Sequence, residues 1–338
     1  MNKATLQKAL EQVKPGLASR ELIEQSTSFA FMGNRVVTYN DEISISHPID
    51  ELDITGAVRA EELYKLLAKL SQDEIEIEIG ENELVLSAGK AKAGLTLQTE
   101  IRLPLLDMSE ITDWKPLPEG FIGALEFCIP SASSDMSRPI LTCLHIRGNG
   151  IIEASDNFRL SSIKTDPMPV NKAFLLPANN AKELIKFPIL EMAEGEGWVH
   201  FKTEEGTVFS MRIFEGTFPD VDAAGILNVT GPEVTFPQSL PDILERASIF
   251  ARRDYSLDEE VTVTIENKKL QVDGKSEYGW FNEKANIKYD GEPIAFVISP
   301  TFLKDMLGKE CICIVGEKSI KFSGENWEHV IQLREIEG

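Results

Sequence analysis

The chain has 338 residues, more than one hydrophobic core usually organises, so we expect two or three domains. Hydrophobic residues make up 42% of the chain and charged residues 26%, which is typical of a globular protein. No apolar run reaches the roughly 18 residues of a membrane span, and the N-terminus lacks the apolar core of a secretion signal. This composition argues against a helical membrane protein, and we expect a cytoplasmic one.

The charge is strongly acidic. The formal net charge is −21, from 34 Lys and Arg against 55 Asp and Glu. An acidic surface repels phosphate groups, which at first argues against nucleic-acid binding. It leaves room for a small basic surface, so the distribution of the charges decides the question.

The same order of elements occurs three times along the chain. Each copy is predicted to begin with an amphipathic helix and to continue with strands, a second helix and further strands. The first helices are expected at 6–13, 121–129 and 240–250, and the second helices at 60–67, 178–185 and 300–307. From 6 to 60, 121 to 178 and 240 to 300 the spacings are 54, 57 and 60 residues, a regularity that favours duplication over chance.

The strands of each copy are predicted from alternating or apolar segments separated by turn residues. Glu74 to Ile79 alternates strictly, so one face of that strand is expected to be apolar and the other acidic. Gly148-Asn149-Gly150 is expected to be a hairpin turn, because a strand follows it and not a phosphate-binding helix. The other strands are expected at 28–31, 35–39, 141–146, 151–154, 173–176, 198–201, 261–265, 270–272, 295–298 and 311–315.

The sequence therefore predicts an α+β protein of three repeated domains. Segments rich in Pro and Gly, near 116–120 and 228–237, are the expected joints. The predicted domains are 1–118, 119–229 and 230–338.

Three motifs narrow the choice of repeat fold. Ser155-Asp156-Asn157-Phe158-Arg159-Leu160 resembles the Thr-Asp-Gly-His-Arg-Leu type of motif in bacterial β sliding clamps, the DNA polymerase III β subunit family. Glu215-Gly216-Thr217-Phe218-Pro219-Asp220 is similar to the Asp-Gly-Arg-Phe-Pro-Asp element of that family. Tyr289-Asp290-Gly291 and the segment 296–307 are similar to its third-domain strand–helix passage. Together, in this order over three repeats, these motifs give a resemblance that spans the whole chain.

The C-terminal end departs from the family pattern. The family commonly ends in an apolar-Pro-apolar-Arg sequence, whereas this chain has Ile331-Gln332-Leu333-Arg334 followed by Glu335-Ile336-Glu337-Gly338. The chain is also shorter than typical members. These departures favour a divergent member, such as one carried by a phage or a mobile element.

The resemblance implies a closed ring with helices lining a central hole and sheets forming the outer wall. Such a ring is a head-to-tail homodimer that encloses double-stranded DNA without reading its sequence. The implied partners are a replicative DNA polymerase and a clamp-loader ATPase, with no membrane and no cofactor. The chain itself contains no Walker motif, so ATP-driven opening would come from another protein.

Basic residues recur at corresponding places in the three copies. The loop after the first helix carries arginine in each copy, and the second helix carries lysine. Such side chains bind phosphates without fixing the protein at one sequence. The alternative is that they only solvate helix faces. The predicted DNA-binding residues are Arg20, Lys65, Lys69, Arg138, Lys182, Lys186, Arg252, Arg253 and Lys304.

The resemblance also implies a surface pocket that binds a short apolar peptide of a partner protein. The alternative is that Leu160, Ile331 and Leu333 are ordinary core residues. The residues carried over to this pocket are Phe158, Arg159, Leu160, Pro219, Phe302, Ile331, Leu333 and Arg334.

The sequence indicates no catalytic or metal site. Its four histidines (His47, His145, His200, His329) are isolated in the sequence, and its four cysteines (Cys128, Cys143, Cys311, Cys313) have no metal-ligand spacing and are expected to be reduced packing residues. Asp156 and Asp220 are expected to fix loops through hydrogen bonds. The alternatives left open are an acidic three-repeat scaffold that does not enclose DNA and, less favoured, a hydrolase.

Overall fold

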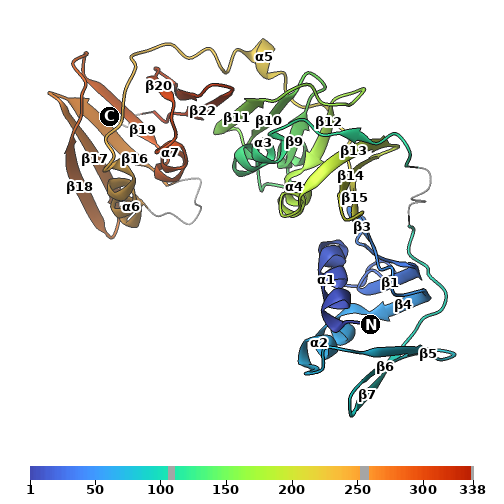
Figure 1. Ribbon diagram of the computed structural model, residues 1–338. Helices are drawn as coiled ribbons and strands as arrows, with labels where there is room; N and C mark the ends of the chain where they lie inside the picture. Colours follow the sequence, from blue (N-terminus) through green and yellow to red (C-terminus); the bar gives the residue numbers. More distant parts are fainter. Residues whose placement is uncertain (106–110, 252–258, 336–338) are drawn as a thin grey trace. The chain divides into compact units, whose positions relative to one another are not determined.

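The computed structural model describes residues 1–105, 111–251 and 259–335 (Figure 1). Helices and antiparallel sheets make this an α+β protein, which confirms the predicted fold class. The chain forms two compact units. The first consists of Met1–Glu126, Ile146–Asn149 and Asp166–Gly216, and the second of Phe127–His145, Gly150–Thr165 and Thr217–Gly338.

The first unit is built on an eight-stranded sheet with the order β4-β1-β2-β3-β15-β14-β13-β8, antiparallel throughout. β3 pairs with β15, placing Ile45 opposite Phe209, and thereby joins strands of the first and second predicted domains. The strands are β1 (Ser28–Gly33), β2 (Arg35–Tyr39), β3 (Ile43–Pro48), β4 (Ile54–Arg59), β8 (Lys115–Pro116), β13 (Ile189–Gly195), β14 (Trp198–Thr203) and β15 (Val208–Arg212).

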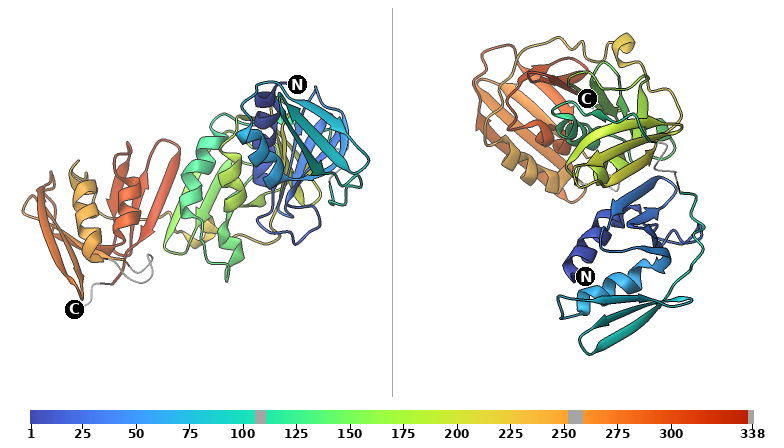
Figure 2. Two further views of the ribbon diagram at one scale, coloured as in Figure 1. Left: turned by 90° about the horizontal axis from the view of Figure 1, so that it is seen from below. Right: turned by 45° about the vertical axis from the view of Figure 1, so that its right-hand side comes forward.

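Two helices of the first unit, α1 (Lys3–Val13) and α2 (Ala60–Lys69), lie side by side (Figure 2). α1 begins at the Asn2 cap, whose side chain accepts a hydrogen bond from the Ala4 N–H, and its Leu6, Leu10 and Val13 are buried. The remaining elements are η1 (Lys14–Gly16), β12 (Phe174–Pro177), α4 (Ala178–Leu184) and a three-stranded antiparallel sheet of β5 (Glu76–Ile79), β6 (Glu83–Ala88) and β7 (Ala91–Thr96).

The second unit contains an antiparallel run of strands in the order β10-β11-β22-β21-β20, with β9 next to β10. β11 pairs with β22, so strands of the second and third predicted domains share this sheet as well. The strands are β9 (Cys143–Ile146), β10 (Ile151–Ser155), β11 (Arg159–Lys164), β20 (Ile312–Val315), β21 (Ser319–Ser323) and β22 (Trp327–Gln332).

A four-stranded antiparallel sheet with the order β18-β17-β16-β19 packs against α6 and completes the second unit. α6 and α7 lie next to each other, and Leu244, Ala247 and Leu303 are fully buried between the elements. The strands of this sheet are β16 (Val261–Glu266), β17 (Lys269–Ser276), β18 (Gly279–Asn286) and β19 (Ile294–Ile298). The helices of the second unit are α5 (Val221–Ala224), α6 (Leu240–Ala251), α7 (Pro300–Met306), η3 (Ile129–Ser131) and η4 (Pro139–Thr142). The residues of α3 (Phe121–Cys128) are divided between the two units.

All six predicted helices are present, with ends shifted by a few residues. The strand predicted at 141–146 is partly wrong, because Leu141 and Thr142 belong to the 3-10 helix η4 and β9 begins only at Cys143. Pro139 fixes the backbone at the start of η4, and the Thr142 hydroxyl donates to the Pro139 carbonyl at 2.7 Å. The strand predicted at 311–315 also begins one residue too early, because β20 starts at Ile312.

The division into domains 1–118, 119–229 and 230–338 stays a prediction. Each of the two large sheets combines strands from neighbouring predicted domains, so the compact units do not follow those boundaries. Within the described ranges, no helix combines the length and apolarity needed to cross a membrane.

Candidate functional site

A surface cavity of about 460 Å³ lies in the second unit and contains four of the predicted pocket residues. Its walls come from the loop before β11, from the segment around α5, and from β21 and β22. Four predicted residues, Phe158, Arg159, Leu160 and Pro219, line it. The other lining residues are Leu141, Ser155, Asn157, Phe218, Val221, Gly225, Ile226, Asn228, Val229, Lys318, Ser319, Val330 and Gln332.

A second cavity of about 250 Å³ adjoins the first, because Phe158 and Gln332 line both. Three further predicted residues, Phe302, Leu333 and Arg334, line this second cavity together with Ser299 and Glu335. The Ser299 hydroxyl is buried and has no hydrogen-bond partner among the residues described. The two cavities form one site with an apolar floor and an aromatic side chain, 39% exposed Phe158, between them.

The Arg159 side chain contacts residues of both cavities. Its guanidinium Cζ lies 4.0 Å from the centroid of the Phe302 ring, and its Nε and Nη1 donate to Asp156 at 3.1 Å and Asp305 at 2.9 Å. Nη2 also donates to the Pro130 carbonyl. Because Asp156 belongs to the pocket loop and Asp305 to α7, one side chain links both cavities.

The loop-fixing roles expected for two aspartates are confirmed. Asp156 Oδ1 accepts hydrogen bonds from the backbone N–H groups of Phe158 at 3.0 Å and Arg159 at 2.9 Å. Asp220 caps α5 by accepting from the Ala223 N–H at 2.9 Å. Asn157 takes the left-handed conformation, with φ of 74°, which turns the chain sharply between these bonds.

Ile331 lies apart from both cavities. It is fully buried in the core of the second unit, so it matches the alternative reading of an ordinary core residue. Leu333 belongs to the same core and also lines the second cavity. Side chains alternate between the two faces of β22, so Val330 and Gln332 line the first cavity whereas Ile331, between them, points into the core.

Several lining residues were missed from the sequence. Phe218 and Val221 flank the predicted Pro219, and their place in the quoted motif and at the start of α5 was a usable signal. Lys318 directly precedes β21 and Ser319 is its first residue, and nothing in the sequence pattern marks either as a pocket residue.

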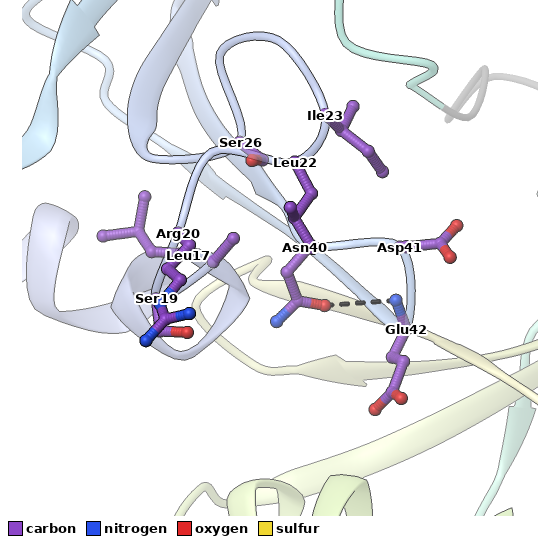
Figure 3. A pocket seen from close by; sticks show the side chains of 10 residues that line it. Leu17, Ser19, Arg20, Leu22, Ile23, Ser26, Asn40, Asp41 and Glu42 are labelled. Atoms are coloured by element: carbon purple, nitrogen blue, oxygen red, sulfur yellow. Dashed lines mark hydrogen bonds between the residues drawn. The ribbon is translucent and has the colours of Figure 1, made fainter.

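The predicted DNA-binding arginines occupy loops. Arg20 is exposed in the first unit and shares a cavity of about 580 Å³ with Asp41 and Glu42 (Figure 3). Arg138 is exposed in the second unit, just before η4. Neither guanidinium forms an ion pair with any residue that the structure describes. Arg252 and Arg253 lie outside the described residues.

The predicted DNA-binding lysines are exposed on the second helices or, for Lys186, two residues after the end of α4, and three of them have acidic neighbours. Lys186 pairs with Glu183 at 2.6 Å, Lys65 pairs with Glu61 of the same helix, and Lys304 pairs with Glu245 of α6. Lys182 reaches only Asn179, at 3.5 Å, and Lys69 lies in the last turn of α2. Exposed pairs of this kind are weak, so they reduce the local positive charge without burying it.

The second unit also exposes an apolar patch at one edge. Tyr278 lies in the turn before β18, the outer strand of the four-stranded sheet, and is 86% exposed. Trp280 lies on β18 and is 73% exposed, and Ile249 of α6 is 60% exposed. Phe250 packs on Phe281 of the same strand, with ring centroids 6.4 Å apart. Large exposed side chains beside an unpaired strand edge are typical of a protein–protein contact.

The histidines have structural environments. His329 Nδ1 lies 2.8 Å from the Ser161 hydroxyl, but both residues are buried, so this pair offers no accessible nucleophile. Burial lowers the pKa of His329 to about 3 and that of His200 to about 4. In the part of the chain that the structure describes, no three His, Cys, Asp or Glu side chains gather to hold a metal ion.

Comparison with solved structures gives full-length matches to bacterial clamps. The chain is similar to the DNA polymerase III subunit beta of Pseudomonas aeruginosa, with 17% identity, 99% of each chain covered and a TM-score of 0.85. It is similar to the DNA polymerase sliding clamp of Bacillus subtilis, with 18% identity, 100% of this chain and 98% of that chain covered and a TM-score of 0.86. The beta subunit from the DNA polymerase of Streptococcus pyogenes gives 21% identity, 99% of each chain and a TM-score of 0.86.

No protein-family model matches the sequence, and no curated protein matches it. The likeness to the clamps is therefore carried by the fold. Because it spans the whole of this chain and nearly the whole of theirs, the chain has the fold of the bacterial β sliding clamps.

Proposed function

We propose that this protein is a DNA sliding clamp that tethers a replicative polymerase through the paired cavities of its second unit. The observation that carries the proposal is the site itself. Seven of the eight residues assigned to a partner pocket from the sequence line two adjoining cavities, and they do so in a chain with the clamp fold. Fold alone hosts many functions, so the site is the stronger argument.

The clamp would retain DNA by enclosure and have no catalytic turnover of its own. A ring that slides needs weak phosphate contacts, and exposed lysines on α2, α4 and α7 together with Arg20 and Arg138 supply such contacts. The carboxylates beside Lys65, Lys186 and Lys304 keep each contact weak. An acidic exterior with net charge −21 would discourage DNA from binding elsewhere.

Ring closure would come from a head-to-tail homodimer of six domains. Among the described residues, the three-stranded sheet of the first unit ends in β5 and β7, and β18 forms an outer edge of the four-stranded sheet of the second unit. The exposed Trp280 on β18 and Ile249 on α6, which packs on this sheet, support an interface at that edge with the first domain of a second copy. A clamp-loader ATPase would open this interface.

Topological retention on DNA tests the proposal. Subunits dissociated by dilution are reassembled in the presence of nicked circular duplex DNA, and the mixture is gel-filtered in 0.5 M salt, which disrupts phosphate contacts. We expect the protein to elute with circular DNA and to be released when a restriction enzyme linearises that DNA. An acidic scaffold without a hole would not be retained in either case, and negative-stain images would show particles without a lumen.

A further inference from the structure

The larger cavity of the second unit carries charge of one sign. Its only charged lining residues are Arg159 and Lys318, and no Asp or Glu of the described chain lines it. This is unusual for a protein with 55 acidic residues. The nearby Asp220 is engaged in capping α5 and does not line the cavity.

The two cations differ in their availability. The Arg159 side chain is largely buried and bonded to Asp156 and Asp305, so its charge is already compensated. Lys318 is exposed, and its amine has no ion-pair or hydrogen-bond partner among the residues described. Its backbone is fixed, because the Leu333 N–H donates to the Lys318 carbonyl at 2.9 Å. Lys318 therefore adds an uncompensated positive charge to the site.

The rim of the cavity also carries open amide groups. The side chains of Asn157, Asn228 and Gln332 line it, and none has a hydrogen-bond partner in the described parts of the chain. Leu160, Phe218 and Val221 supply buried apolar surface at the same site. Such a site fits an extended peptide, with apolar side chains toward the floor and backbone groups toward the amides.

Building on the proposed function, we infer that the partner peptide is acidic as well as apolar, and that Lys318 selects it by pairing with an Asp or Glu side chain next to its apolar anchors. The pairing follows from charge complementarity, because no carboxylate of the cavity competes for Lys318. An acidic peptide would be repelled by most of this protein's surface, so the cavity would be its favoured docking place.

A peptide scan measures this preference. The probes are fluorescein-labelled octapeptides that carry Leu and Phe, one residue apart, in a Ser/Ala background, with Asp or Asn at each remaining position in turn. Binding to the full chain is followed by anisotropy in 50 mM salt. At one position we expect Asp to bind about three- to tenfold more tightly than Asn.

Two variants locate the effect. Lys318→Gln should reduce the Asp-to-Asn affinity ratio to about one, because it should weaken binding of the Asp peptide much more than binding of the Asn peptide. Lys288→Gln makes the same charge change at an exposed position outside the cavity and should keep the ratio. A ratio that survives Lys318→Gln, equal affinities at every position, or no binding by any peptide would overturn the inference. Retention on circular DNA does not involve Lys318, so it would report separately on the proposed clamp function.

Discussion

The Arg159 guanidinium lies over the Phe302 ring, with Cζ 4.0 Å from the ring centroid. This contact joins the first residue of β11 to α7, two elements that each line one of the adjoining cavities. Since Arg159 also donates to Asp156 and Asp305, the shape of the whole site depends on one side chain.

Replacing Arg159 should therefore affect stability and binding together. Arg159→Ala leaves the buried Asp156 without its guanidinium partner, and a hydrogen bond to a charged group contributes about 1.5–3 kcal/mol. We expect urea unfolding to show a loss of about that size, and the Leu–Phe peptides to bind more weakly. Arg159→Lys keeps the charge but loses the planar fork, so it should recover little.

Arg246→Ala is the matched control for that experiment. Arg246 also makes two bonds to one carboxylate, Glu283, but on the exposed surface, so its removal should change stability little. Equal unfolding midpoints for Arg159→Ala and the unaltered protein would contradict the role assigned to Arg159.

The exposed patch beside β18 should control assembly. Ile249→Asp places a charge within the proposed dimer contact, and we expect the dimer dissociation constant to rise at least 100-fold. Light scattering would then report a particle of 37.6 kDa in place of one twice as heavy. Leu190→Asp makes the same change at another exposed apolar residue, on β13, and should leave the dimer intact. A dimer unaffected by Ile249→Asp would move the interface elsewhere.

Carboxylates beside the helix lysines should limit DNA affinity. The triple change Glu61→Gln, Glu183→Gln and Glu245→Gln removes the partners of Lys65, Lys186 and Lys304. The freed lysines should bind phosphates, so we expect DNA affinity to rise about tenfold at low salt, with a steeper dependence of log affinity on log salt.

A second triple variant separates local charge from net charge. Glu76→Gln, Glu196→Gln and Glu325→Gln also adds three units of positive charge, at exposed positions away from the second helices. This variant should raise DNA affinity much less. Equal gains in the two variants would mean that the helix lysines do not contact DNA.

Much of the fold was predictable, because helix periodicity and strand alternation are local signals. Leu6, Leu10 and Val13 mark the buried face of α1 in the sequence as clearly as in the structure. The start of β9 was not predictable in this way, since Pro139 and the Thr142 hydroxyl stabilise a 3-10 turn where the apolar residues suggested a strand.

The site was predictable where motifs cover it and not beyond. Phe158, Arg159 and Pro219 came from recognisable sequence, whereas Lys318 reaches the cavity only because β21 lies beside β22 in the folded sheet. Ile331 shows the opposite error, since a single position along β22 decides whether a side chain faces the cavity or the core. Pairings between distant strands set both outcomes, and no local pattern encodes them.

Two buried histidines should make the protein sensitive to acid. Burial lowers the pKa of His200 to about 4 and of His329 to about 3, below the ordinary value of 6.5 that applies when the chain is unfolded. Between these values the unfolded chain binds more protons than the folded one, so the free energy of unfolding falls as pH decreases below 6.5. Each histidine contributes a slope of up to about 1.4 kcal/mol per pH unit, which falls to half near pH 6.5 and vanishes roughly one unit higher. Urea unfolding between pH 7.5 and 4.5 measures this slope. The double variant His200→Asn, His329→Asn retains the same acidic residues, so it should show a shallower decline, whereas parallel curves for the two proteins would mean that these histidines do not titrate with unfolding.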